Sequence, residues 1–419
     1  MITRIEALNY RCLRDISMPL SRFHVLVGPN ASGKTTFLDV IGFINDLVKD
    51  DLDEAISRRT SNPVELLFSR KGSCFELALE ACIPEHLRAK SSKPQLDTAR
   101  YEIRIGFDET GRQFEIKEER FLLKKNNRGA PVDHDFFPAL RDVRSTIISA
   151  RAGRDIKTII KKSPGGNDNF YSEVYHEAGK GWTPSFKLGP RKSALRNLPA
   201  DENALPIATW FREFVSSGVQ PFMLNSLALR KPSPPTKIKG FLPDGSNLPW
   251  VIERFRRDHA ERFRDWIDHL KTALPDLVDI DTIEQPWDKH CYLVYKYGND
   301  LEVPSWLVSD GTLRLTALTL PAYLGDLEGV YLVEEPENGI HPAAVSAVYD
   351  SLSSVYDAQV LLATHSTVVL NAASPGDVLC FAKNADGSTD IVAGSDHPRL
   401  RNWKGGVNLG TLLASGVLG

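Results

Sequence analysis

A short glycine-rich motif constrains the fold of this chain more than any other feature. Residues 28–35 read Gly-Pro-Asn-Ala-Ser-Gly-Lys-Thr and fit the pattern G-x-x-x-x-G-K-[ST]. The apolar run Phe23–Val27 ends at this motif, and Thr35–Val48 then carries apolar residues at helical spacing. A glycine loop between a buried strand and a helix is typical of α/β proteins that bind phosphate groups. A chance glycine-rich turn is the alternative, and the flanking strand and helix argue against it.

The motif offers three kinds of contact to a nucleotide. Its glycines let successive backbone N–H groups point at phosphate oxygens, and the next helix presents its positive N-terminal end. Lys34 is expected to place a charge on the β- and γ-phosphates and to assist catalysis, while the Thr35 hydroxyl is placed to bind Mg²⁺. We therefore predict an enzyme that binds and hydrolyses ATP with Mg²⁺. The residues expected to contact ATP here are Gly28, Pro29, Asn30, Ala31, Ser32, Gly33, Lys34, Thr35 and Thr36.

A second segment joins an apolar strand to a run of acids. Residues 330–337 read Val-Tyr-Leu-Val-Glu-Glu-Pro-Glu. Charges at the carboxyl end of a parallel strand lie where α/β sheets bind ligands. We expect Glu334 to hold Mg²⁺, directly or through water, and Glu335 to be the catalytic base that polarises the attacking water. The alternative is a solvated acidic turn after a core strand.

The segment 361–366 repeats this design with different polar residues. It reads Leu-Leu-Ala-Thr-His-Ser, an apolar strand followed by a polar end. We predict that His365 contacts the γ-phosphate as a catalytic residue that senses its presence. A histidine with a purely structural role is the alternative, and its place at the end of a third such strand favours function.

The remaining patterns predict an α/β fold in three parts. Residues 1–125 form an N-terminal ATPase lobe in which strands follow one another as an antiparallel meander, with Gln113–Lys117 and Arg120–Lys124 as separate strands. Residues 126–240 are rich in Gly, Pro and Asn and are expected to form a helical, loop-rich insertion. Residues 241–419 alternate helices and strands, which implies a parallel sheet in a C-terminal ATPase lobe.

Composition narrows the cellular setting. The net charge is −3, so the whole chain has no basic field that would attract nucleic acid. Five cysteines are scattered without a C-x-x-C pair, as expected for a protein of the reducing cytosol. The N-terminus lacks the apolar core of a signal peptide, and no run of 18 apolar residues occurs. We expect a cytoplasmic protein without a membrane segment.

One local segment departs from this charge balance. Residues 141–197 contain twelve Lys and Arg against five Asp and Glu, a net charge of +7. Contact with a DNA backbone is one interpretation, and a solvated surface or a face for an acidic protein is another. Few aromatic residues interleave, which argues against stacking on single strands. The basic residues of this segment include Arg151, Arg154, Lys157, Lys161, Lys162, Arg191, Lys192 and Arg196.

Taken in this order, the motifs resemble the ABC-type ATPase heads of the SMC/RecF/OLD group. The resemblance covers about residues 1–50 and 300–375. The segment 307–315, Leu-Val-Ser-Asp-Gly-Thr-Leu-Arg-Leu, resembles the family signature with S-D-G-T in place of S-G-G-Q. In the family this element opens a helix and contacts the γ-phosphate held by another subunit, and Ser309 and Gly311 match the contacting positions. The resemblance therefore implies an ATP-sandwiched homodimer or a higher homo-oligomer.

The resemblance also assigns roles to two other places. Residues 336–342 match the D-loop, which in the family touches the opposite subunit. Arg11 stands where relatives carry an arginine near the nucleotide, although a surface arginine after a strand is equally compatible with the sequence. The family's Q-loop glutamine has no clear match, and Gln113 and Gln220 are unsupported candidates.

What the chain lacks indicates how it acts. It has no sustained heptads, unlike rod-shaped SMC proteins, and the 54 residues after His365 are too few for a Toprim nuclease of the OLD type. It resembles AAA-family ATPases without a Toprim domain, such as ATPase subunits of bacterial anti-phage defence systems. We expect a switch for a separate effector, a nuclease, toxin or Toprim-like protein. The alternative is a RecF/SMC-like ATPase that binds DNA in repair or recombination.

Overall fold

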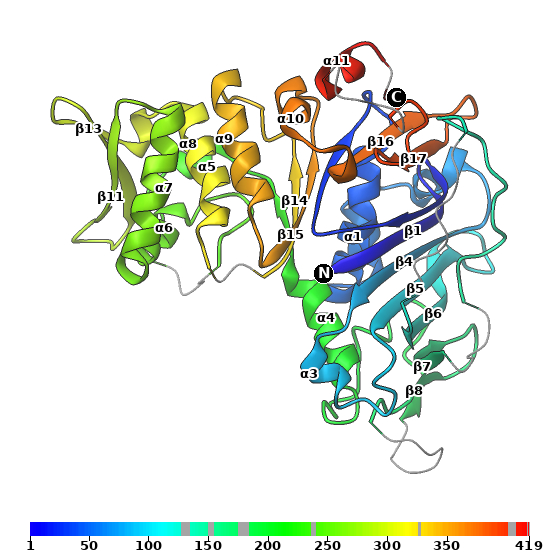
Figure 1. Cartoon of the computed structure of the whole chain (residues 1–419). Helices are drawn as coiled ribbons and strands as arrows, with labels where there is room; N and C mark the ends of the chain where they lie inside the picture. The colour runs from blue at the N-terminus through cyan, green and yellow to red at the C-terminus, as the bar shows by residue number, and fades with distance from the viewer. Residues whose placement is uncertain are drawn as a thin grey trace.

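A computed structural model describes most of the chain. The described residues are 1–126, 135–149, 155–174, 184–235, 240–325, 328–400, 408–416 and 418. They form two large sheets on one side of the molecule and a lobe of helices with a small sheet on the other (Figure 1). The predicted α/β class is confirmed.

The core sheet has six strands in the order β10-β14-β15-β3-β16-β17. The first five run parallel, and β17 pairs antiparallel with β16. Their bounds are β3 Phe23–Val27, β10 Val219–Phe222, β14 Gly329–Glu334, β15 Ala358–Ala363, β16 Val378–Lys383 and β17 Thr389–Ala393. Strands that are distant in the sequence thus place their carboxyl ends along one edge.

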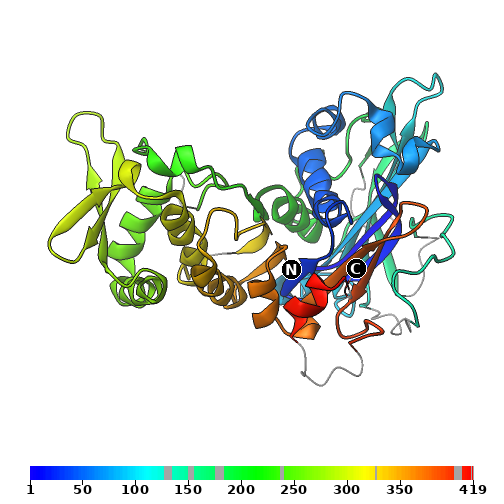
Figure 2. The same ribbon diagram turned by 90° about the horizontal axis from the view of Figure 1, so that it is seen from above.

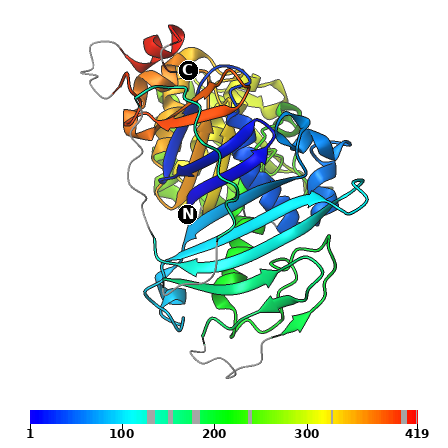
Figure 3. The ribbon, with the colours of Figure 1, turned by 90° about the vertical axis from the view of Figure 1, so that its right-hand side faces the viewer.

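An antiparallel sheet of eight strands lies beside the core sheet, in the order β2-β1-β4-β5-β6-β7-β8-β9 (Figure 3). Its strands are β1 Ile2–Tyr10, β2 Leu13–Pro19, β4 Cys74–Cys82, β5 Thr98–Phe107, β6 Phe114–Lys124, β7 Ile156–Lys162, β8 Asp168–Phe170 and β9 Ser185–Phe186. Helix α1, Lys34–Lys49, packs between the two sheets. The Phe37 ring meets Phe381 of the core sheet at 5.5 Å, and the Phe43 ring meets Tyr10 of β1 at 5.9 Å.

Alternation along the core strands directs their side chains into two separate apolar cores. Leu26 points into the core shared with α1, whereas Val25 and Val27 point into the core on the other face. That second core joins the distal helical lobe to the sheet (Figure 2). Its helices and small sheet are α5 Ser226–Arg230, α6 Leu248–Asp258, α7 Ala260–Ala273, β11 Leu277–Glu284, β12 Cys291–Tyr297, β13 Leu301–Pro304, α8 Asp310–Thr319 and α9 Pro342–Ser353. The other α-helices are α2 Leu52–Ser57, α3 Glu85–Arg88, α4 Pro206–Gly218, α10 Thr367–Ala372 and α11 Leu409–Ala414.

Two expected elements differ from the structure. The amphipathic pattern over Pro249–Leu274 predicts one helix, but two helices meet at His259, whose φ of −139° and ψ of 57° are not helical. The apolar face continues across this break, with the Phe255 and Phe263 rings 5.7 Å apart, so periodicity alone does not reveal it. The two strands predicted within 113–124 are one strand, β6, with a register irregularity against β5.

The segment 126–240 also contains more strand than its composition suggests. Strands β7, β8 and β9 extend the eight-stranded sheet, and β10 forms one edge of the core sheet. Strands β8 and β9 have only three and two residues, and β7 reads Ile-Lys-Thr-Ile-Ile-Lys-Lys, so none of the three shows a clear alternation. The segment therefore contributes to both sheets in addition to α4 and α5.

The division of the chain into three parts remains a prediction. Within the described ranges, no helix is long and apolar enough to cross a membrane.

A buried histidine in β3 gives the fold an expected dependence on pH. His24 is 5% exposed; Ser21 N–H donates to its Nε2 at 2.8 Å, so Nδ1 carries the proton and donates to the Asp377 carbonyl at 3.2 Å. Burial lowers the pKa of His24 from 6.5 to about 4, and the bond to Asp377 opposes this only in part. The folded state thus resists protonation that the unfolded chain accepts below pH 6.5.

We expect the free energy of unfolding to fall with pH because of His24. The contribution of neutral His24 to stability is fully present above pH 6.5 and is lost progressively toward pH 4. The loss between pH 7 and 4.5 is about 2.5 kcal/mol. Urea unfolding of the wild type and of His24→Gln at these two pH values measures the difference. The variant should lose less stability than the wild type on acidification. Equal losses in both proteins would show that His24 does not carry the effect.

Candidate nucleotide-binding site

The motif 28–35 follows β3, and its last two residues form the first turn of α1, as the motif predicts. Gly28 has a φ of 151° and Gly33 a φ of 104°, values that side chains disfavour. A Cβ at Gly28 would lie 2.2 Å from the Phe381 carbonyl oxygen, and one at Gly33 would lie 2.3 Å from Thr389 Oγ1. Both glycines are therefore required where the loop passes close to β16 and β17.

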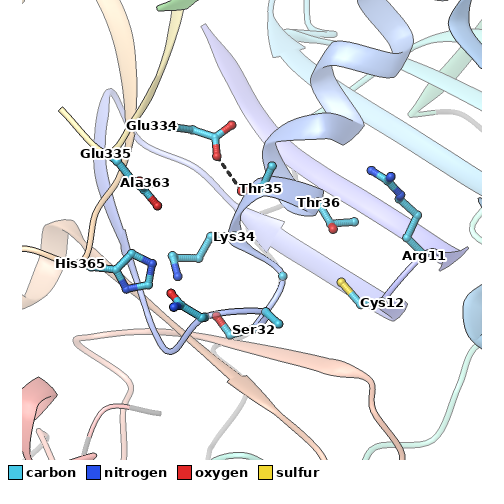
Figure 4. A pocket seen from close by; sticks show the side chains of 13 residues that line it. Arg11, Cys12, Ser32, Lys34, Thr35, Thr36, Glu334, Glu335, Ala363 and His365 are labelled. Atoms are coloured by element: carbon cyan, nitrogen blue, oxygen red, sulfur yellow. Dashed lines mark hydrogen bonds between the residues drawn. The ribbon is translucent and has the colours of Figure 1, made fainter. Parts of the chain in front are cut away.

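A cavity of about 650 Å³ opens beside this loop (Figure 4). Its walls come from the loop, the start of α1, the turn between β1 and β2, and the ends of β14 and β15. The lining residues are Arg11, Cys12, Asn30, Ala31, Ser32, Gly33, Lys34, Thr35, Thr36, Glu334, Glu335, Ala363 and His365. The structure thus brings together most of the residues that the sequence singles out for nucleotide contact.

Strand register explains why these residues meet. Glu334 of β14 lies beside Ala363 of β15, and Ala363 lies beside Leu26 of β3. The residues that follow each strand therefore emerge at the same level of the sheet edge. Glu335, His365 and the glycine loop all begin there.

Lys34 lies under the loop and is 7% exposed. Its Nζ donates to the carbonyl oxygens of Gly28 at 2.8 Å and Pro29 at 3.1 Å. Burial lowers the pKa of the Lys34 ammonium, and the nearby carboxylates of Glu335, Glu334 and Glu337 act in the opposite direction. The ammonium therefore fastens the loop and faces the cavity from its floor.

Thr35 and Glu334 form a pair of oxygen ligands at the cavity wall. The Thr35 hydroxyl donates to Glu334 Oε2 at 2.6 Å. Hydroxyl and carboxylate oxygens suit Mg²⁺, which usually keeps only one or two protein ligands beside phosphate oxygens and water. Among the described ranges, no three His, Cys, Asp or Glu side chains gather as a metal site of their own. The pair fits a cation that arrives with a nucleotide.

Glu335 occupies a strained position at the end of β14. Its φ is 47°, in the left-handed region that costs a residue with a side chain about 1 kcal/mol. The backbone is held there because Glu335 N–H donates to the Ala363 carbonyl at 2.8 Å. Asn338 Nδ2 donates to Glu335 Oε2 at 2.5 Å, a contact that the sequence analysis missed. The geometry directs an exposed carboxylate at the cavity.

His365 follows β15, and its imidazole lines the same cavity from the side opposite Arg11 (Figure 4). Its backbone N–H donates to Glu337 Oε1 at 2.9 Å. The preceding Thr364 donates its backbone N–H to the Leu26 carbonyl at 3.1 Å, which ties this loop to β3. The side chain is therefore carried on a backbone that is fixed on two sides.

Ser309 and Gly311 lie at the N-terminus of α8 and are not among the lining residues of the cavity. Ser309 Oγ accepts the Thr312 N–H at 3.2 Å and caps the helix, and Ser309 and Asp310 are exposed. A Cβ on Gly311 would lie 2.6 Å from the Gly339 carbonyl oxygen, so α8 packs closely on the loop after β14. Arg230 holds Asp310 by an ion pair of 2.6 Å.

The two glutamines considered for a Q-loop do not line the cavity. Gln113 accepts a hydrogen bond from Arg191 at 3.1 Å, and Gln220 lies in β10 beside Tyr331. Arg11 does line it, from a turn with a φ of 51°, and its guanidinium donates to Asp39 at 3.1 Å. Asp39 thus orients the arginine beside the loop.

Two further residues at the site come from positions that the motifs do not mark. Cys12 lies against Gly33 and lines the cavity next to Arg11. Thr389 in β17 donates its hydroxyl to the Ser32 carbonyl at 2.9 Å and so supports the loop from behind. Thr389 lies in the last strand of the sheet, and only the pairing of β16 with β3 brings it close.

Several basic residues of the segment 141–197 pair with acids, one of them within the segment and two elsewhere in the chain. Lys162 donates to Asp168 at 2.8 Å in a buried pair, Arg191 pairs with Asp53, and Arg196 lies 3.6 Å from Asp51. Lys157 is also engaged, at the Glu173 carbonyl and the Ser92 hydroxyl. Arg151 and Arg154 lie outside the described residues. These pairs reduce the positive charge offered to a DNA backbone.

Comparison with known proteins identifies the family. A family model described as "AAA domain, putative AbiEii toxin, Type IV TA system" matches residues 97–371. The chain belongs to this AAA family. A second model, "AAA ATPase domain", matches residues 1–133 of this AAA protein.

One sequence relative and two solved structures are similar to parts or to most of this chain. The OLD nuclease of Thermus scotoductus is 46% identical over 52 residues, which span 12% of this AAA protein and 9% of the nuclease. An SMC head crystallised with the C-terminal winged-helix domain of ScpA superposes with a TM-score of 0.52 at 16% identity, covering 93% of this chain and 97% of that one. A Pyrococcus furiosus SMC head with an extended coiled coil gives 0.49 at 14% identity, covering 93% and 95%.

These findings confirm the resemblance drawn from the motifs. The family and the fold fit an ABC-type ATPase of the SMC/RecF/OLD group, and the α/β fold is that of an SMC head. The solved structures support the fold alone, because their sequence identity is low.

Proposed function

We propose that this protein binds Mg²⁺-ATP in the 650 Å³ cavity and hydrolyses it. The observation that carries the proposal is that five side chains meet at one edge of the core sheet. They are Lys34, Thr35, Glu334, Glu335 and His365. Three parallel strands, aligned in register, deliver the phosphate loop, two acids and a histidine to a single cavity. Phosphoryl transfer depends mainly on such positioning and on electrostatic stabilisation.

The chemistry of the side chains supports separate roles. Lys34 would bind the β- and γ-phosphates, and Thr35 with Glu334 would hold Mg²⁺. Glu335 would orient a water against the γ-phosphorus and take its proton as the bond to the ADP oxygen breaks. His365 would contact the γ-phosphate, and Arg11 would lie beside the nucleotide.

The position of the signature supports a site completed by a second copy. Ser309 and Gly311 stand on an exposed helix N-terminus that does not border the cavity of their own chain. A helix N-terminus favours an anion, and the γ-phosphate bound by another copy is the anion that this arrangement fits. We therefore propose an ATP-sandwiched homodimer, or a higher homo-oligomer built from the same contact.

The relatives support a regulatory role. The family description names a putative toxin of a type IV toxin–antitoxin system, and the short sequence match is to an OLD nuclease. We propose that the ATP-dependent dimer acts in the cytoplasm as a switch for a separate effector, a nuclease, a toxin or a Toprim-like protein, in bacterial anti-phage defence. The pairing of Lys162, Arg191 and Arg196 with acids gives the alternative, a DNA-binding repair ATPase, less support.

Ser309→Arg tests the composite site. Since Ser309 does not line the cavity of its own chain, the variant should bind ATP as the wild type does, measured by calorimetry. Its turnover should fall about 100-fold, because a long side chain would fill the space where the second copy's phosphate is expected. Ser217→Arg, which makes the same change at an exposed serine near the end of α4, is the matched control and should keep full activity.

Mixing variants extends this test. Ser309→Arg and Lys34→Ala chains should each be inactive, but a mixed dimer would contain one intact composite site. Random pairing then restores at most about a quarter of the wild-type rate. Wild-type turnover by Ser309→Arg alone would contradict the sharing of sites.

A further inference from the structure

The loop after β14, here called the acidic loop and defined as residues 335–341, lies between the cavity and helix α8. It begins with Glu335 at the cavity and leads into α9. Two side chains fasten it: Asn338 donates to Glu335 within the loop, and Glu337 reaches across to the end of β15. The proposed function gives Glu337 no role.

Glu337 binds the His365 loop with one carboxylate oxygen. Its Oε1 accepts the Thr364 hydroxyl at 2.7 Å and the His365 backbone N–H at 2.9 Å. Its Oε2 is also buried and has no hydrogen-bond partner among the described residues. Hydrogen bonds to an ionised carboxylate are about twice as strong as neutral ones, so this link is firm. A shift of the His365 backbone would therefore be passed to the acidic loop.

The other end of the acidic loop packs against α8. The Gly339 carbonyl lies so close to Gly311 that a Cβ there would approach it to 2.6 Å. Ile340 is buried in the same apolar core as Leu313, which lies two residues after Gly311 on α8. Packed elements of this kind move together because no free space separates them. A displacement of the acidic loop should therefore move the N-terminus of α8, where Ser309 lies.

We propose that Glu337 is a positioning residue that couples His365 to the acidic loop, so that a nucleotide at His365 sets the position of Ser309 on α8 of the same chain. Binding in the cavity then controls the position of the signature residues Ser309 and Gly311 of the same copy. A copy that holds ATP would present a correctly placed signature to its partner. This inference rests on the proposed ATP site and adds its regulation.

Two Glu337 variants separate this coupling from other effects. Glu337→Ala removes both acceptor bonds to the His365 loop. Glu337→Gln keeps an oxygen acceptor at the same place but removes the charge that acts on Lys34. Glu85→Ala, which removes an exposed carboxylate on α3, serves as the matched control. Thermal unfolding of each variant reports whether it is folded.

The first readout is kinetic. Glu337→Ala should bind ATP within about 3-fold of the wild type, since its side chain does not line the cavity, but its kcat should fall at least 10-fold. Glu337→Gln should recover most of the kcat. Wild-type kcat in Glu337→Ala would overturn the proposal, and so would equal losses in the Ala and Gln variants, because charge and not the hydrogen bonds would then be responsible.

The second readout tests the link inside one chain. Hydrogen exchange of residues 310–316 is compared with and without AMP-PNP, a non-hydrolysable ATP analogue, in proteins that all carry Ser309→Arg so that no second copy covers α8. The analogue should change exchange in the protein that keeps Glu337 and in Glu337→Gln, and should leave it unchanged in Glu337→Ala. The same response in all three proteins would overturn the coupling. A wild type that fails to bind AMP-PNP would instead contradict the proposed ATP site, so the two failures are distinguishable.

Discussion

Lys34→Ala is expected to abolish ATP binding, weakening it by at least about 100-fold, or about 3 kcal/mol. The Lys34 ammonium lies at the cavity floor at 7% exposure, where water screens its charge poorly. It also holds the carbonyls of Gly28 and Pro29, so its loss removes both a phosphate contact and a fastening of the loop.

A matched variant on the same helix isolates this effect. Lys49→Ala changes an exposed lysine at the far end of α1 and should bind ATP like the wild type. Calorimetric titration with Mg²⁺-ATP measures both proteins, and thermal unfolding checks that both are folded. Retained affinity in Lys34→Ala would mean that the cavity does not bind ATP through this loop.

Glu335→Gln is expected to keep ATP binding and to lose hydrolysis. The amide preserves the size of the side chain and can still accept the hydrogen bond from Asn338, but it cannot take a proton. Removing a general base of this kind lowers kcat by about 100-fold or more. Because the γ-phosphate then persists, ATP-bound dimers should accumulate.

Phosphate release under saturating ATP measures this loss. Glu328→Gln changes an exposed glutamate just before the opposite end of β14 and should hydrolyse ATP normally. Hydrolysis by Glu335→Gln at the wild-type rate would show that Glu335 is not the base.

The residues that the sequence identified share one property. The glycine loop, Glu334, Glu335 and His365 each follow directly on an apolar strand, so a local pattern carries both the element and its chemistry. Parallel strands then bring their ends together without further information. The α/β class and most of the cavity lining could be predicted for this reason.

The rest depended on contacts between distant parts of the chain. Thr389 supports the loop from the opposite end of the sequence, and Asp51 and Asp53 neutralise arginines in the segment predicted to be basic. The break at His259 left the apolar pattern unchanged, because the two helices keep one buried face. No local pattern marks such features.

The mass of Glu335→Gln in solution tests the central claim most directly. Sedimentation velocity is run with Mg²⁺-ATP, without nucleotide, and with Ser309→Arg added to the same chain. We predict that ATP at least doubles the mass of Glu335→Gln, that the mass returns to that of a single chain without nucleotide, and that Ser309→Arg prevents the increase. A single-chain mass at saturating ATP, in protein that calorimetry shows to be ATP-bound, would contradict a site shared between two copies.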